Sequence, residues 1–245
     1  MNLSDHCNEV AAFLGLSQQA CIERIQKGFH YNHAEVAKDF LQKNVNVNDP
    51  TALLNWYKNT DAYIWELSAY HLEPGFNYEG MCEGIAVGLK NSNKNKVLSI
   101  GDGIGTLSIR LAQEGLEATY NDLRGSKTAN FAQHRFAGRP ELNISVSLTE
   151  DFNPKLGENK YDAVVALDFF EHVVNVDEWA KAVYNCLRSS GVLIAQNAFG
   201  IGDIEHGNSI PMHLSVNNKY ETEWPILLTS IGFVLHSNNQ WWVKP

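Results

Sequence analysis

The stretch that decides the fold is "KVLSIGDGIGTLSIRLA", residues 96–112. It opens with a short, mainly apolar run typical of a buried strand, and apolar residues recur at helical spacing from Thr106 onward. Between the two stand Gly101, Gly103 and Gly105. Glycine permits positive φ angles and close approach of a ligand to the backbone. The first turn of a helix also offers unpaired N–H groups. The stretch therefore predicts a ligand-binding turn between a strand and a helix.

Strands and helices alternate from residue 95 to the end of the chain. The expected strands are 96–100, 117–122, 142–148, 161–167, 192–198, 233–237 and 241–244. The expected helices are 106–115, 126–138, 176–191 and 221–232. This alternation predicts a parallel sheet covered by helices on both faces. Such sheets bind ligands at the carboxyl ends of their strands.

Acidic residues follow three of the expected strands. Asp122 ends the second strand, 17 residues after Gly105, where a carboxylate can accept hydrogen bonds from both hydroxyls of a ribose. Asp151 and Phe152 come after the third strand, where a carboxylate can bind an adenine amino group while the ring packs on the base. Asp168 ends the fourth strand. In this order, these residues indicate a nucleoside-binding edge.

Residues 94–245 resemble the class I S-adenosylmethionine-dependent methyltransferases over about three-fifths of the chain. The glycine stretch is similar to the first motif of that family, "LDFFEHV" (167–173) to its fourth, and "SSGVLIAQNAF" (189–199) to its fifth strand. "MHLSVNNKYETEWPILLTSIGF" (212–233) is similar to the approach to its sixth strand. The resemblance implies an α/β fold with a doubly wound, seven-stranded, mostly parallel sheet. Its last strand, 241–244, would run antiparallel.

The resemblance also implies S-adenosylmethionine as the cofactor and a set of residues that hold it. These are Gly101, Asp102, Gly103, Gly105, Asp122, Leu123, Asp151, Phe152 and Asp168. Two positions depart from the family pattern. The family commonly has an acid where this chain has Ser99, and often a small residue or cysteine where it has Asp102. A carboxylate at Asp102 could bind the ammonium group of the cofactor, directly or through water.

Methyl transfer requires alignment of the nucleophile with the sulfonium and, for some acceptors, removal of a proton. His172 follows the fourth strand and can act as the base; the alternative is that it only packs against the cofactor or caps a helix. Glu171 is a second candidate, which could also bind an amine. His206 and His213, in the irregular stretch after the fifth strand, are candidate substrate contacts; otherwise they are loop histidines, or His213 anchors the loop.

The first 93 residues are expected to form a helical lid over a methyltransferase domain at 94–245. The patterns predict helices at 18–28, 33–44, 51–73 and 78–91. The third of these is rich in aromatic residues. Among its side chains, Tyr63, Tyr70 and His71 are expected to line a pocket for a small, partly apolar or cationic acceptor.

Composition and charge limit the classes of partner that this chain is expected to bind. The chain has 245 residues, a net charge of −9 and no run of lysine or arginine, which argues against general binding of a nucleic acid backbone. The expected compartment is the cytoplasm, because the four cysteines are scattered and no signal sequence or membrane-spanning run is present. His30 and His33 could share a helix face, but they have no recognisable ligand partners nearby. No metal is therefore expected.

The leading hypothesis is N- or O-methylation of a small metabolite or natural-product intermediate. A peptide- or protein-modifying enzyme is the second interpretation, favoured by an open groove. A non-catalytic interaction module that keeps the fold is the third. An NAD-dependent oxidoreductase fits less well, because the third glycine of its motif would fall at Thr106. The methylated atom and the oligomeric state are left open.

Overall fold

The computed structural model describes residues 2–29, 34–200, 212–237 and 241–245. Its sheet has seven strands in the order β3-β2-β1-β4-β5-β7-β6. The strands are β1 Lys96–Ile100, β2 Glu117–Asn121, β3 Ile144–Val146, β4 Tyr161–Leu167, β5 Leu187–Gln196, β6 Val234–Leu235 and β7 Trp241–Val243. Strands β1 to β5 pair in parallel, and β7 lies antiparallel to both β5 and β6. The expected doubly wound sheet with an antiparallel last strand is confirmed.

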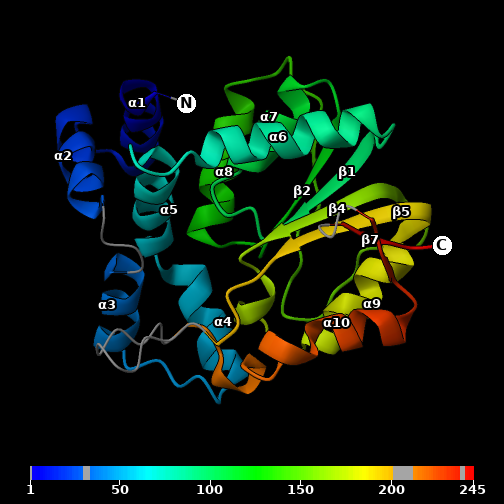
Figure 1. The fold of residues 1–245 in the computed structure, drawn as a ribbon. Coiled ribbons are helices and arrows are strands. Elements are labelled where there is room, and N and C mark those ends of the chain that lie inside the picture. Colours follow the sequence, from blue (N-terminus) through cyan, green and yellow to red (C-terminus); the bar gives the residue numbers. More distant parts are fainter. Residues whose placement is uncertain (1, 30–33, 201–211, 238–240) are drawn as a thin grey trace.

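Helices cover both faces of this sheet, as Figure 1 shows. On one face lie α6 Tyr78–Asn91, α7 Thr106–Gln113 and α8 Lys127–Ala137; on the other lie α9 Val176–Cys186 and α10 Tyr220–Ile231. Because side chains alternate along a strand, Leu98 and Val164 pack on the α9 side while Val97 and Val165 pack on the α6 side. The central strands are thus buried on both faces.

The N-terminal helices lie beside the sheet (Figure 1). They are α1 Leu3–Leu14, α2 Gln18–Gly28, α3 Ala34–Gln42, α4 Pro50–Asn59 and α5 Ala62–Leu72. Helices α1, α2 and α5 share a hydrophobic cluster with Ile104 and Phe131. The Lys58 ammonium also donates to the Glu150 carbonyl at 3.0 Å. The boundary expected at residue 93 stays a prediction.

The expectation of one helix over 51–73 is wrong. Two helices occupy the stretch, because the backbone at Thr60 is extended (φ −78°, ψ 141°) and caps α4. The Thr60 hydroxyl donates to Asp39 at 2.8 Å and accepts from the Ala62 amide at 3.1 Å, which starts α5. Helix α1 was not expected, although Asn2 caps it. The expected helix 176–191 ends earlier, at Cys186, and β5 begins at the next residue, Leu187.

Candidate active site

A cavity of about 340 Å³ opens at the carboxyl ends of the parallel strands. Gly101 follows β1, Asp122 follows β2, Asp168 follows β4 and Gln196 ends β5, and all four line the cavity. The opposite wall comes from the N-terminal helices. It consists of Tyr57, Tyr63, Glu66, Leu67, Tyr70 and His71. The site is therefore built jointly by the sheet and by α4 and α5.

Eight of the nine residues expected to hold the cofactor line this cavity. They are Gly101, Asp102, Gly103, Asp122, Leu123, Asp151, Phe152 and Asp168. Gly105 is the exception. It has a φ of 76° and caps α7, and a Cβ there would meet the Phe136 ring of α8 at 2.6 Å. At this position glycine is explained by the turn and by packing between α7 and α8.

The carboxylate of Asp102 caps α7. It is buried and accepts hydrogen bonds from the amides of Leu107 at 3.0 Å and Ser108 at 2.7 Å. Burial raises the pKa of this carboxyl to about 6, against the opposing effect of the two amides. Each oxygen can accept a second hydrogen bond, so a contact with the cofactor's ammonium group stays a prediction. The local role of Asp102 is to hold the glycine turn against α7.

Asp122 joins the ends of β1 and β2. Its Oδ2 accepts from the Gly103 amide at 3.0 Å and its Oδ1 from the Leu123 amide at 2.6 Å. Burial raises the pKa of Asp122 to about 6, and the nearby Asp102 carboxylate raises it further. These amide contacts orient the carboxylate at the cavity wall. A ribose would find an acceptor there that needs no rearrangement.

Part of the cavity lining is an aromatic wall formed by Tyr57, Tyr63, Phe152 and His172. The rings of Tyr57 and Tyr63 stack, with centroids 5.7 Å apart, and both present their rings edge-on to His172. Burial raises the pKa of both phenols, so they are neutral at physiological pH. Phe152 meets Tyr57 edge to face at 6.3 Å. This half of the site suits an apolar or aromatic ligand with a polar group.

The two other expected substrate contacts on α5 are tied to the protein. His71 is stacked on Tyr78 with ring centroids 3.7 Å apart, and its Nδ1 lies 3.0 Å from the Thr106 hydroxyl. Burial holds the pKa of His71 well below its usual value, so this imidazole is neutral. Tyr70 stacks on Phe76. Both line the cavity, and their contact with substrate stays a prediction.

The expected catalytic pair lies in the single turn Phe170–His172 after β4. His172 lines the cavity, and its Nδ1 is 3.2 Å from both the Tyr57 hydroxyl and the Met212 carbonyl. Glu171 does not line the cavity. It is 1% exposed and accepts from the Ala198 amide at 2.8 Å. His213 lines the cavity 4.8 Å from His172, ring to ring, while His206 lies outside the described residues.

Three contributors to the site were not singled out from the sequence. Tyr57 and Trp179 line the cavity, and the Trp179 indole donates to the Phe152 carbonyl at 2.7 Å. Asn217 is buried behind the turn that carries His172. The aromatic richness of 51–73 could have indicated Tyr57. No sequence signal marks Asn217, because its role depends on three carbonyls from another part of the chain.

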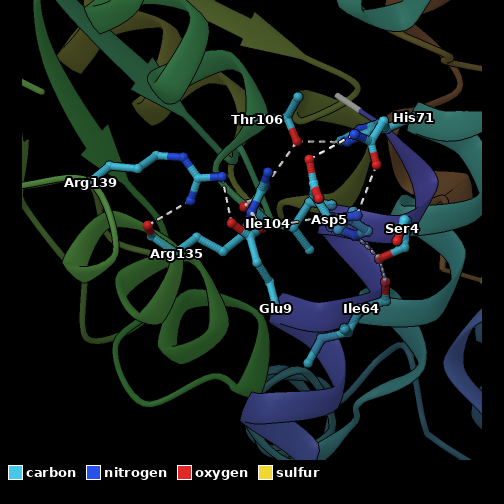
Figure 2. Close-up of polar contacts among 12 residues, drawn as sticks. Ser4, Asp5, Glu9, Ile64, His71, Ile104, Thr106, Arg135 and Arg139 are labelled. Carbon is cyan, nitrogen blue, oxygen red and sulfur yellow. Dashed lines mark hydrogen bonds and ion pairs between the residues drawn. The ribbon is translucent and has the colours of Figure 1, made fainter. Parts of the chain in front are cut away.

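A buried charge network connects the glycine turn to α1, as Figure 2 shows. The Arg135 guanidinium, 2% exposed, donates to the Ile104 carbonyl at 2.6 Å and to Glu9 at 2.9 Å. It also donates to the Thr106 hydroxyl, which lies beside His71. Arg139 pairs with the same Glu9. The backbone around the glycine turn is therefore held from α8 and α1.

Comparisons with known proteins identify a domain family for part of the chain. Residues 98–193 match the model of the methyltransferase domain family. The chain is 29% identical over 118 residues to YqeM of Bacillus subtilis (strain 168), covering 45% of this chain and 46% of that protein. It is 28% identical over 145 residues to the ubiquinone biosynthesis O-methyltransferase of Rickettsia typhi, covering 57% of this chain and 54% of that protein.

The fold is shared with solved structures. The magnesium protoporphyrin IX methyltransferase ChlM from Synechocystis PCC 6803, crystallised with bound S-adenosylhomocysteine, aligns with a TM-score of 0.56 at 18% identity. The alignment covers 80% of this chain and all of that one. At this identity the similarity establishes the fold alone.

Residues 98–193 carry a methyltransferase domain, and the sequence motifs had indicated the S-adenosylmethionine-dependent class of such domains. S-adenosylmethionine is the cofactor that this domain family uses. The chain spans about half the length of the curated relatives it matches. None of the helices among the described residues combines the length and apolar character needed to cross a bilayer; the cytoplasmic location stays a prediction.

Proposed function

We propose that this protein transfers the methyl group of S-adenosylmethionine to a nitrogen or oxygen of a small molecule. One observation carries the proposal. Among the described residues that line the cavity there is no lysine or arginine, whereas five are acidic: Glu66, Asp102, Asp122, Asp151 and Asp168. A cavity lined by one sign of charge attracts ligands of the opposite sign. The sulfonium and ammonium groups of S-adenosylmethionine fit this requirement.

In this proposal, donor and acceptor occupy different parts of the cavity. The glycine turn and Asp122 would hold the methionine and ribose parts, with Asp151 and Phe152 at the adenine. The methyl group would then face the wall of Tyr57, Tyr63 and His172. Positioning an acceptor at near-attack distance there would supply much of the rate enhancement.

The wall of the cavity formed by α4 and α5 favours a small acceptor. A peptide-modifying enzyme would be expected to have an open groove, whereas α4 and α5 place Tyr57, Tyr63 and Tyr70 over the carboxyl edge of the sheet. The volume of about 340 Å³ is also in the range of small-molecule sites.

His172 is the candidate for handling a proton of the acceptor. The Met212 carbonyl can only accept a hydrogen bond, so Nδ1 of His172 carries its proton and Nε2 holds the lone pair. Nε2 could then accept a proton from a hydroxyl or an ammonium group. The same lone pair could instead bind a cation, and the two roles exclude each other.

The test is a transfer assay with isotopically labelled methyl donor. The full-length protein is incubated with a panel of phenols and catechols, a panel of small amines, and a peptide mixture. Labelled product from one of the small-molecule panels is expected, and it should be lost in Asp122→Ala. Gly84→Ala, on the exposed side of α6 with nothing within 4 Å of its new Cβ, serves as the control that keeps activity. Label appearing only in peptides would contradict the proposal.

A further inference from the structure

Three potential metal ligands converge beside the aromatic wall. Glu171, His172 and His213 each offer one ligand atom, and these atoms lie within 4.8 Å of one another. Glu171 and His172 belong to the turn after β4, whereas His213 comes about 40 residues later in the chain. We propose that these three side chains bind one divalent transition-metal ion at the acceptor end of the cavity.

The backbone that carries the three side chains is held in place before any ion binds. The Leu214 amide donates to the Glu171 carbonyl at 3.0 Å. The buried Asn217 side chain donates to the carbonyls of Phe170, Glu171 and Val173, the last at 2.7 Å. These bonds join the His213 segment to the Glu171 segment. A metal site requires such support, because ligands must be positioned by their surroundings.

The hydrogen bonds of His172 select the tautomer that binds metals. Its Nδ1 lies 3.2 Å from the Met212 carbonyl oxygen, which only accepts, and 3.2 Å from the Tyr57 hydroxyl, whose oxygen can also accept. The proton therefore sits on Nδ1, and Nε2 carries the lone pair. A metal-binding histidine commonly donates its second N–H to a backbone carbonyl, which fixes the ring and its tautomer. Met212 is the residue directly before His213, so one segment orients the first ligand and supplies the next.

Glu171 would bring the negative charge that the ion needs. Its side chain is 1% exposed, and the Ala198 amide donates to Oε1 at 2.8 Å, which fixes the plane of the carboxylate. Placing a carboxylate in an apolar interior costs free energy, and a cation next to it lowers that cost. The second carboxylate oxygen is the ligand atom we assign to the ion.

The ligand set indicates the class of ion. Two imidazoles and one carboxylate suit zinc, iron, cobalt or manganese, whereas magnesium and calcium prefer oxygen ligands alone. Three protein ligands also leave coordination positions open. His172 and His213 both line the cavity, so a ligand in the cavity can reach the ion. These three residues were singled out from the sequence for other roles; their meeting was not predicted, because His213 lies about 40 residues after the other two.

A role for the ion rests on the proposed function. An acceptor hydroxyl bound to the ion loses its proton more readily, and that proton passes to solvent water. The resulting oxygen anion would attack the methyl carbon. The carbon–sulfur bond breaks, its electron pair stays on sulfur, and the products are the methyl ether and S-adenosylhomocysteine. A hydroxyl-bearing acceptor is therefore the substrate class that this site favours.

The experiment titrates Co²⁺ into full-length protein first treated with a chelator. Visible absorption reports the coordination of Co²⁺, and competition with Zn²⁺ reports affinity. Wild type is expected to take up about one ion per chain with new visible bands. His213→Gln and Glu171→Gln should weaken binding at least about tenfold, since loss of a supporting residue alone costs 10- to 100-fold. His134→Gln, on the exposed side of α8, is the matched control and should bind as wild type does.

Binding of S-adenosylhomocysteine is measured on the same samples. Retained binding in the variants shows that they are folded. Wild-type protein without new Co²⁺ bands, or with an affinity equal to that of His213→Gln, would overturn the metal site. If S-adenosylhomocysteine still binds in that case, the proposed function stands without the ion. Co²⁺ bands in a protein that does not bind S-adenosylhomocysteine would instead remove the proposed function and leave the metal site.

Discussion

At the scale of single residues, Asp122 shows how the backbone prepares a ligand site. Two amides orient its carboxylate, and burial raises its pKa from 3.8 to about 6. Its position after the second strand was predictable from spacing. The raised pKa was not, because it depends on the buried Asp102 next to it and on the helices that exclude water from both carboxyls.

Binding of S-adenosylhomocysteine should weaken in acid. Below about pH 6 the Asp122 carboxyl holds a proton, and ribose hydroxyls bind the ionised form, so binding must release that proton. Affinity should fall about tenfold for each pH unit below about 6 and level off above it. Calorimetric titration from pH 5 to pH 8 measures this. Asp102→Asn should keep a pH dependence but shift it to lower pH, because the Asp102 carboxylate helps to raise the pKa of Asp122. Asp122→Asn should bind weakly at every pH, and a flat wild-type profile would refute the assignment.

Gly103 should not tolerate a side chain. Its φ is 56°, and a Cβ would lie 2.4 Å from the Leu67 Cδ1 of α5. Gly103→Ala should therefore lower the free energy of unfolding by about 1–3 kcal/mol and weaken cofactor binding. Gly84→Ala, in the middle of α6, should instead raise it by about 0.5–1 kcal/mol. Urea denaturation of wild type and both variants measures these free energies of unfolding. Equal changes in Gly103→Ala and Gly84→Ala would show that the backbone conformation at Gly103 does not exclude a side chain.

At the scale of elements, the regular strands and helices of the sheet followed from hydrophobic patterning. The errors lie where tertiary contacts override a pattern. Helical spacing runs through residue 60, but the Thr60 hydroxyl bonds to Asp39 of α3 and interrupts the helix. The glycine turn was recognised, yet its attachment to α1 through Arg135 and Glu9 joins residues 126 positions apart.

Glu9→Gln should destabilise the protein by about 2–3 kcal/mol at pH 7, because the buried Arg135 loses its charged partner. Burial alone would raise the pKa of Glu9, but His6, Arg135 and Arg139 lower it from 4.5 to about 2. The ion pair thus stabilises the fold above pH 4.5, and this contribution is lost as the pH falls toward 2. The melting temperatures of wild type and Glu9→Gln should therefore converge in acid. A constant difference down to pH 2 would show that the charge of Glu9 is not responsible.

At the scale of the whole molecule, the N-terminal helices complete the site. Tyr57, Tyr63 and Tyr70 stand on α4 and α5, and the carboxylates stand on the sheet, so neither part contains the cavity alone. The sequence indicated both halves, including the aromatic wall. The joining of Glu171, His172 and His213 could not be foreseen, because it depends on how a segment after β5 returns to the end of β4.

The central claim is that this cavity binds S-adenosylmethionine. Calorimetric titration of S-adenosylmethionine and S-adenosylhomocysteine into the full-length protein at pH 7.5 tests it most directly, with Asp122→Ala and Gly84→Ala as variants. Micromolar binding is expected for wild type and Gly84→Ala, with a loss of at least about 2 kcal/mol in Asp122→Ala. Absence of binding to folded wild-type protein, or equal affinity in Asp122→Ala, would contradict the account.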